Sequence, residues 1–111
     1  MSNVTTHVLD AVAGTPAAAV PVAIERRSDG EWQRLAVSQT DGDGRCHDLS
    51  VDDTSVGVHR LVFDTGAYFA ASGQPAFYPE VVVTFEIAAT REHYHIPLLL
   101  SPFSYTTYRG S

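Results

Sequence analysis

The chain has 111 residues and a formal net charge of −6, with 44% hydrophobic and 18% charged residues. This composition is typical of one folded domain with its own core, and it excludes a disordered chain. The acidic balance excludes a positively charged surface that would attract nucleic acid or an anionic membrane.

The single cysteine, Cys46, cannot form an intramolecular disulfide, which suits a reducing compartment. No basic patch followed by an apolar core opens the sequence, and no apolar run reaches the ~18 residues of a membrane span. The last three residues are not the peroxisomal signal Ser-Lys-Leu. We therefore expect a cytoplasmic protein whose residues 1–111 form a single domain.

Most of the predicted elements are strands, taken here in chain order. The first is Val4–Leu9, in which His7 shares a face with Thr5 and Leu9. Next, Val22–Arg27 and Trp32–Val37 flank Ser-Asp-Gly, which predicts a hairpin. The stretch from Val58 to Asp64 then alternates, with Leu61 and Phe63 on one face.

A short helix is predicted after these strands, at about residues 65–72. Asp64 or Thr65 offers the N-terminal cap, alanines follow, and Gly73 ends the segment. Strand character returns in Val81–Ile87, where every odd position is apolar and should face inward. Turn signals recur about every ten residues between these segments, which indicates an all-β sandwich or barrel with one short helix.

The C-terminal part predicts a strand over Tyr94–Leu100, with its even-numbered residues on one face and His93, His95, Pro97 and Leu99 on the other. Pro97 lacks a backbone N–H, so we expect this strand at a sheet edge, or Pro97 on its open side. An apolar strand at an edge favours an oligomer that covers it. Ser101–Tyr105 predicts a turn into one more strand, which would anchor the tail.

The histidines are the first candidates for chemistry, because imidazole titrates near neutral pH. His7 and His95 each have a plain structural interpretation as half-buried histidines with a satisfied partner. His93 and His95 point the same way, and with His7 they offer three ligands to a zinc ion. Arg45 counts against a metal if it joins the same pocket, because a fixed cation repels another.

Arg45 and the tail complete the set of candidates. Arg45 follows the glycine-rich loop Asp41–Gly44 and is either a solvated hairpin tip or a fork of donors for a planar, electron-rich substrate. The residues Tyr108, Arg109, Gly110 and Ser111 would bring a ring, a guanidinium, a hydroxyl and a carboxylate to one place. Nucleophile-triad motifs and a phosphate-binding glycine loop are missing from the sequence.

Four motifs together resemble those of the transthyretin-related proteins, and within that family the 5-hydroxyisourate hydrolases. They are Thr6–Asp10 (THVLD), Asp43–Arg45 (DGR), His93–Pro102 (HYHIPLLLSP) and Tyr108–Ser111 (YRGS), and the likeness runs from about Thr6 to Ser111. The thyroid-hormone carrier transthyretin is not expected to have the final tetrapeptide, or histidine and arginine at positions 7, 45 and 95.

The resemblance implies a transthyretin-like two-sheet β-sandwich assembled as a homotetramer, with active sites at the subunit interface in a central channel. It also implies hydrolytic opening of 5-hydroxyisourate, the product of urate oxidation, to 2-oxo-4-hydroxy-4-carboxy-5-ureidoimidazoline, with no metal or other cofactor. Its functional residues map to His7, Arg45, His95 and Ser111 as catalytic, and to Arg45, Tyr108, Arg109, Gly110 and Ser111 as substrate-binding.

Several points stay open at this stage. The residues do not decide which histidine takes the first proton, or what His93 does. The alternatives to this enzyme are a non-enzymatic transthyretin-like carrier of small molecules in the same channel and a zinc hydrolase built on His7, His93 and His95.

Overall fold

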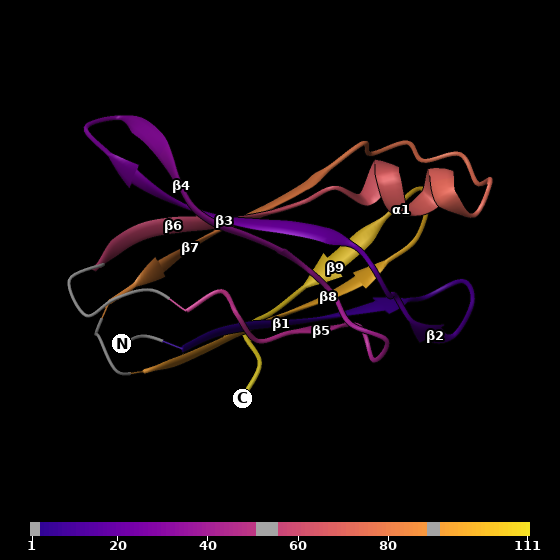
Figure 1. Ribbon diagram of the computed structural model, residues 1–111, viewed down its shortest axis with the longest axis horizontal. Coiled ribbons are helices and arrows are strands. Elements are labelled where there is room, and N and C mark those ends of the chain that lie inside the picture. The colour runs from indigo at the N-terminus through magenta and orange to yellow at the C-terminus, as the bar shows by residue number, and fades with distance from the viewer. Residues whose placement is uncertain (1–2, 51–55, 89–91) are drawn as a thin grey trace.

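The computed structural model describes residues 3–50, 56–88 and 92–111, and in these ranges the chain forms two β-sheets and one short helix (Figure 1). The elements are β1 (Asn3–Asp10), β2 (Thr15–Pro16), β3 (Pro21–Ser28), β4 (Glu31–Gln39), β5 (Arg45–Cys46), β6 (Gly57–Phe63), α1 (Thr65–Ala71), β7 (Val81–Ile87), β8 (His93–Leu100) and β9 (Tyr105–Thr107).

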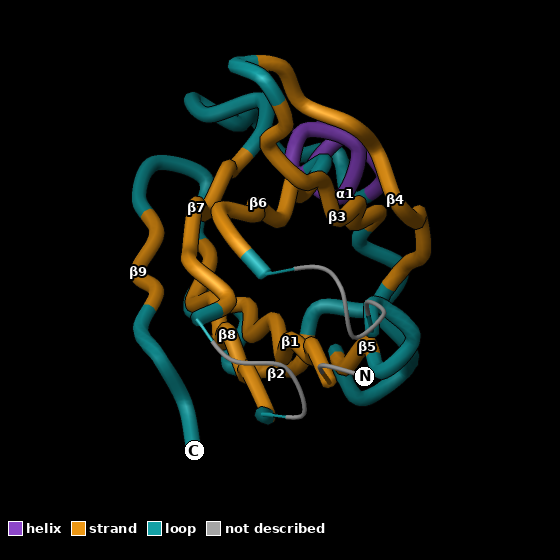
Figure 2. The backbone as a smooth tube through the Cα atoms, turned by 90° about the vertical axis from the view of Figure 1, so that its left-hand side faces the viewer, coloured by secondary structure: helices purple, strands orange, loops and turns teal. Residues whose placement is uncertain are grey.

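The two sheets face each other as the layers of a sandwich (Figure 2). One has the order β4-β3-β6-β7, and the other has the order β2-β1-β8-β9 with β5 also paired to β1. Ile24, Leu61 and Phe63 of the first sheet and Val8 and Leu98 of the second are fully buried between them. The two-sheet β-sandwich with one short helix expected from the sequence is therefore confirmed.

The predicted hairpin is formed by β3 and β4. Its two turn residues, Asp29 and Gly30, have φ angles of 53° and 80°, and Ser28 pairs with Glu31 across the turn. Two left-handed residues give a turn whose twist matches that of the flanking strands, and Asp followed by Gly is favoured there. The Asp-Gly dipeptide thus fixes the register of the hairpin.

The helix α1 also lies where the sequence predicts it. The Asp64 side chain caps it by accepting a hydrogen bond from the backbone N–H of Ala67 at 3.1 Å. Phe69 is buried in the core, and the Tyr68 hydroxyl donates to Asp10 Oδ2 at 2.7 Å, which ties the helix to the end of β1. Within the described ranges, no helix is long and apolar enough to cross a membrane.

The strand β8 is not at an edge, so that prediction was wrong. It lies between β1 and β9 and pairs with β1 in parallel. Because His95 O accepts a hydrogen bond from the β9 side, the backbone of Pro97, two residues on, faces that side too. On that side the Thr107 hydroxyl donates a hydrogen bond to Pro97 O at 2.7 Å. A side chain, and not a ladder of backbone hydrogen bonds, thus joins β9 to Pro97, which has no N–H to donate.

Candidate active site

The parallel register of β1 and β8 brings the candidate residues onto one face of the sheet. Thr5 pairs with His95 and His7 pairs with Pro97, while Arg45 of β5 pairs with His7 from the other side. Residues opposite each other in a sheet project to the same face. Since Val4, Thr6 and Val8 point into the core, His7, Arg45 and His95 share the outer face.

A tight loop delivers Arg45 to this face. The Asp41 side chain accepts hydrogen bonds from the backbone N–H groups of Asp43 (2.9 Å) and Arg45 (3.0 Å). Gly44 has a φ angle of 76°, and a Cβ there would clash with the carbonyl oxygen of Val8. Only glycine meets both conditions at position 44. The Arg45 side chain is exposed, so its guanidinium is available to a ligand.

His7 is half-buried and is oriented by the same loop. Its Nε2 lies 2.9 Å from the carbonyl oxygen of Asp43. A carbonyl only accepts hydrogen bonds, so this nitrogen carries the proton. In the neutral ring the other nitrogen, Nδ1, is then the one that can accept a proton.

His95 is half-buried and is held from behind by Thr5. Its Nδ1 lies 2.7 Å from Thr5 Oγ1, and no described residue hydrogen-bonds Nε2. Burial lowers the pKa of His95, and the nearby charges of His93, Arg45 and His7 lower it further, while an interaction with the backbone of Thr5 acts in the opposite direction. A neutral His95 with a free Nε2 is equipped to take a proton near neutral pH.

The tail runs alongside His95. The backbone N–H of Gly110 donates to His95 O at 2.8 Å, which continues the β8–β9 pairing past the end of β9. By this register Tyr108 lies opposite Pro97, on the outer face with the His95 ring. Tyr108 is 58% exposed, and Ser111 is exposed beyond Gly110. The predicted strand before the tail is confirmed as β9.

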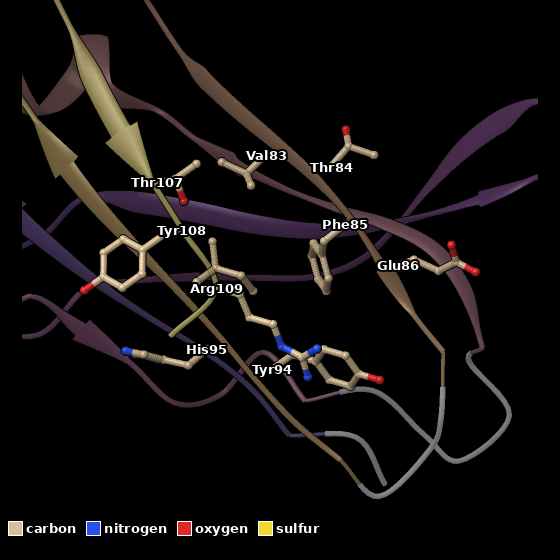
Figure 3. A pocket seen from close by; sticks show the side chains of 10 residues that line it. Val83, Thr84, Phe85, Glu86, Tyr94, His95, Thr107, Tyr108 and Arg109 are labelled. Carbon is tan, nitrogen blue, oxygen red and sulfur yellow. The ribbon is translucent and has the colours of Figure 1, made fainter. Parts of the chain in front are cut away.

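The Arg109 side chain points away from the histidines. Its Cζ lies 5.0 Å from the centroid of the Tyr94 ring, and its Nη2 lies 3.8 Å from Glu92 Oε2. Figure 3 shows the guanidinium over Tyr94, with Tyr108 and His95 together on the other side. The structure thus brings His7, Arg45, His95, Tyr108 and Gly110 to one region of the chain, but not the Arg109 side chain.

A cavity of about 290 Å³ opens beside the tail (Figure 3). It is lined by Val83–Glu86 of β7, by residues 94–96 of β8 and by residues 107–109. His7, Thr5 and Arg45 do not line it. Within one chain, His95 and Tyr108 therefore border this cavity, whereas His7 and Arg45 lie outside it on the water-accessible face.

The arrangement of the histidines gives no support to the zinc alternative. Among the residues that the structure describes, no three or more histidine, cysteine, aspartate or glutamate side chains are placed to hold a metal ion. The Nε2 of His7 bonds a carbonyl oxygen and the Nδ1 of His95 bonds Thr5. These bonds orient the two rings as acid–base groups.

The sequence did not reveal the part played by Thr5 and His93. Thr5 Oγ1 lies within hydrogen-bond distance of both His95 Nδ1 and His93 Nε2, at 2.7 and 3.1 Å. In the sequence, alternation along the first strand already places Thr5 on the same face as His7, which indicates that its hydroxyl could contact the residues of that face. Its partners are 90 and 88 residues away, and only the pairing of β1 with β8 identifies them.

Comparison with known proteins agrees with the resemblance seen in the motifs. The model of the HIUase/Transthyretin family matches residues 4–110. The chain belongs to this family. Across the full length of both proteins it is 45% identical to 5-hydroxyisourate hydrolase of Caulobacter vibrioides. The expected family is therefore confirmed.

Solved structures of two kinds within the family are similar to this chain. Klebsiella pneumoniae 5-hydroxyisourate hydrolase matches with a TM-score of 0.86 and 37% identity over 100% of both chains. Sea bream transthyretin in complex with thyroxine matches with a TM-score of 0.90 and 38% identity, over 96% of this chain and 93% of that one. The family fold thus accommodates an enzyme and a hormone-binding protein, and the residues of the site must distinguish them.

Proposed function

We propose that this chain is a 5-hydroxyisourate hydrolase, which opens the ring of its substrate by hydrolysis of a cyclic amide. The observation that carries the proposal is the meeting of two imidazoles and a guanidinium, from His7, His95 and Arg45, on one water-accessible sheet face. The names of the curated relatives support the same substrate, 5-hydroxyisourate, an intermediate of urate degradation.

Ring opening needs a proton acceptor for the attacking water and a proton donor for the departing nitrogen. His95 presents an Nε2 that has no partner among the described residues, and His7 presents Nδ1 because its Nε2 is bonded to Asp43 O. The two histidines supply both functions, and a positioned general acid or base typically contributes ~10²–10⁴-fold in rate.

Arg45 binds the oxygens of the substrate and stabilises the negative charge of the tetrahedral intermediate. Its guanidinium is permanently charged and carries a planar fork of donors that suits such oxygens. Donors fixed in advance at the site of developing charge are often the largest contribution to catalysis. The hydrogen bonds of Asp41 and the conformation of Gly44 fix the backbone that carries Arg45.

The tail closes one side of the site. Tyr108 packs near the substrate ring, and Ser111 places its hydroxyl or terminal carboxylate to orient water or a histidine. Gly110 allows the tail to lie directly against His95. Substrate binding by Arg109 stays a prediction, and the contacts of Arg109 with Tyr94 and Glu92 support a role in holding the tail.

The working enzyme is a homotetramer with sites where subunits meet. The open histidine face supports this assembly, because a site that excludes water needs a second wall. Exposed aromatic side chains also support it, since Phe77, Tyr78, Phe103 and Tyr105 are 69%, 38%, 67% and 40% exposed. A metal or organic cofactor has no step in this mechanism, and a cytoplasmic location stays a prediction.

A small-molecule carrier is the less supported alternative. A carrier of hydrophobic hormones needs mainly apolar walls, whereas His7, Arg45 and His95 give this face charge and acid–base groups. The deciding experiment adds the protein to freshly oxidised urate and follows the absorbance of the transient intermediate. We expect the intermediate to decay faster with enzyme, in proportion to its concentration, and also after treatment with a strong chelator. Decay at the spontaneous rate would reject the proposal.

A further inference from the structure

A chain of hydrogen bonds runs behind the reactive side of His95 and ends at His93. Thr5 Oγ1 lies 2.7 Å from His95 Nδ1 and 3.1 Å from His93 Nε2, and Thr5 is only 6% exposed. The register of β1 and β8 holds the three groups together, because Thr5 pairs with His95 and His93 lies two residues earlier on the same face. The two imidazole centroids are 6.1 Å apart.

A threonine hydroxyl has a single proton, and this gives the three groups two arrangements. In the first, His95 Nδ1–H donates to Thr5 and Thr5 donates to His93 Nε2, so His95 Nε2 has a free lone pair. In the second, His93 Nε2–H donates to Thr5 and Thr5 donates to His95 Nδ1, so His95 Nε2 carries a proton. The first arrangement makes His95 a base, and the second makes it an acid.

We propose that Thr5 and His93 are positioning residues that form a proton relay behind His95. This inference rests on the proposed function for its role in catalysis. When His95 Nε2 takes a proton from the attacking water, its Nδ1 proton passes to Thr5 and the hydroxyl proton passes to His93 Nε2. His93 is then the cation. The reverse transfer returns the proton to His95, whose Nε2–H protonates the departing nitrogen.

The surroundings favour moving the positive charge to His93. His95 is half-buried. The charged or titratable groups near it are Arg45 on β5, His7 on β1 and His93, and each disfavours a positive charge on His95. His93 is exposed to water. Asn3 Nδ2 lies 3.5 Å from His93 Nδ1, which is too long to fix the protonation of that nitrogen. A cation is thus better solvated on His93, two residues further from the guanidinium.

The test replaces Thr5 with valine, which keeps the shape and removes the hydroxyl. We expect Thr5→Val to lower kcat by ~10-fold or more, within the range for general acid–base catalysis, with little change in KM because Thr5 does not touch the substrate. Thr5→Ser should restore most of kcat. Thr6→Val is the matched control, because Thr6 donates to Ile96 O at 2.6 Å on the buried face; it should change stability but not kcat.

A double-mutant cycle separates a relay from two independent structural effects. His93→Asn keeps a polar, exposed side chain that cannot store a proton, and we expect it to lower kcat as Thr5→Val does. If the residues act in one chain, the double variant is no slower than the slower single variant. The relay would be overturned if the loss of kcat in the double variant were the product of the two single losses. It would also be overturned if both single variants kept a kcat within 2-fold of wild type. His93→Asn also provides the test if Thr5→Val fails to fold.

Histidine ring ¹⁵N spectra of the full-length protein test the relay without any substrate. In the wild type we expect the signals of a hydrogen-bonded Nδ1 for His95 and a hydrogen-bonded Nε2 for His93, because Thr5 Oγ1 lies 2.7 and 3.1 Å from these nitrogens. In Thr5→Val both signals should move toward those of ring nitrogens without this partner, because the hydroxyl between the two rings is gone. Unchanged His95 signals in Thr5→Val would reject the relay. If the hydrolysis assay fails but the two hydrogen-bonded signals are present in the wild type and lost in Thr5→Val, only the proposed function is rejected.

Discussion

The imidazole of His95 lies directly against the α-carbon of Gly110. A Cβ added at position 110 would come within 2.6 Å of His95 Cδ2 and 3.1 Å of Pro97 Cγ. The backbone hydrogen bond from Gly110 to His95 O, at 2.8 Å, holds the two strands at this distance. The glycine of the final tetrapeptide is thus required by the ring beside it, because any side chain there displaces either the tail or His95.

Gly110→Ala should therefore reduce catalysis without unfolding the protein. A displacement of about 1 Å in a catalytic group can cost ~10² in rate, and we expect kcat to fall by at least ~10-fold. Steady-state kinetics with a thermal melt would measure this effect. Gly42→Ala is the matched control, because nothing lies within 4 Å of a Cβ at that position. Wild-type kcat in Gly110→Ala would show that the tail and the ring do not need this contact.

Replacing His95 itself should have a larger effect. We expect His95→Asn to lower kcat by ~10²–10⁴-fold, because the variant keeps a polar group but loses the nitrogen that exchanges protons. The assembly should stay intact, which gel filtration would check beside the assay of absorbance decay. Turnover close to that of the wild type would remove His95 from the mechanism.

Local signals in the sequence predict most of the fold. The Asp-Gly turn between β3 and β4, the cap of α1 at Asp64 and the inward odd positions of β7 each depend on residues close together in the chain. The position of β8 depends instead on its parallel pairing with β1, which joins residues 90 apart. A proline read locally indicates an edge strand, because the sequence does not show that Thr107 contacts the Pro97 carbonyl.

The site was predictable as a set of residues but not as a network. The motifs identify His7, Arg45 and His95, and alternation places the two histidines on outward positions of their strands. The connection of Thr5 to both His93 and His95 needs the register of two strands. The direction of the Arg109 side chain likewise depends on Tyr94 of the neighbouring strand β8 and on Glu92 just before that strand.

Removing residues 108–111 should abolish activity and leave the melting temperature nearly unchanged. The tail contributes the backbone hydrogen bond from Gly110 to His95 O and an ion pair of Arg109, whose side chain is 67% exposed. Exposed ion pairs contribute only ~0–1 kcal/mol. Kinetics, melting and gel filtration of the truncated protein would test this. If the truncated protein unfolds or dissociates, the tail is structural.

Arg109→Ala tests whether that side chain binds the substrate or holds the tail. Because its guanidinium contacts Tyr94 and Glu92, we expect a smaller loss of kcat than in the truncated protein, with KM raised less than ~10-fold. Tyr94→Leu, which removes the ring under the guanidinium, should give a similar loss. A much larger effect of Arg109→Ala than of Tyr94→Leu would place the guanidinium on the substrate.

A buried histidine outside the site should make the fold sensitive to acid. His59 is fully buried, its Nδ1 lies 2.9 Å from Gly57 O, and its Nε2 has no hydrogen-bond partner in the described part of the chain. Burial lowers the pKa of His59, with a further contribution from Arg26, and the bond to Gly57 only partly opposes this. In the unfolded chain the ring titrates near its ordinary pKa of about 6.5.

Below a pH of about 6.5 the unfolded state therefore binds more protons than the folded state, so the free energy of unfolding decreases as the pH falls. Above that pH the contribution of the neutral, buried ring to stability is fully present. His95, whose pKa is also lowered, adds to the same slope. Denaturant melts of the wild type between pH 7 and pH 5 should show this loss, in a window above the ordinary pKa values of carboxyl side chains, about 3.9 and 4.3. His59→Phe should flatten the slope, whereas His47→Gln, at an exposed position, should keep it. An equal slope in His59→Phe and the wild type would mean that the buried ring does not control the acid sensitivity.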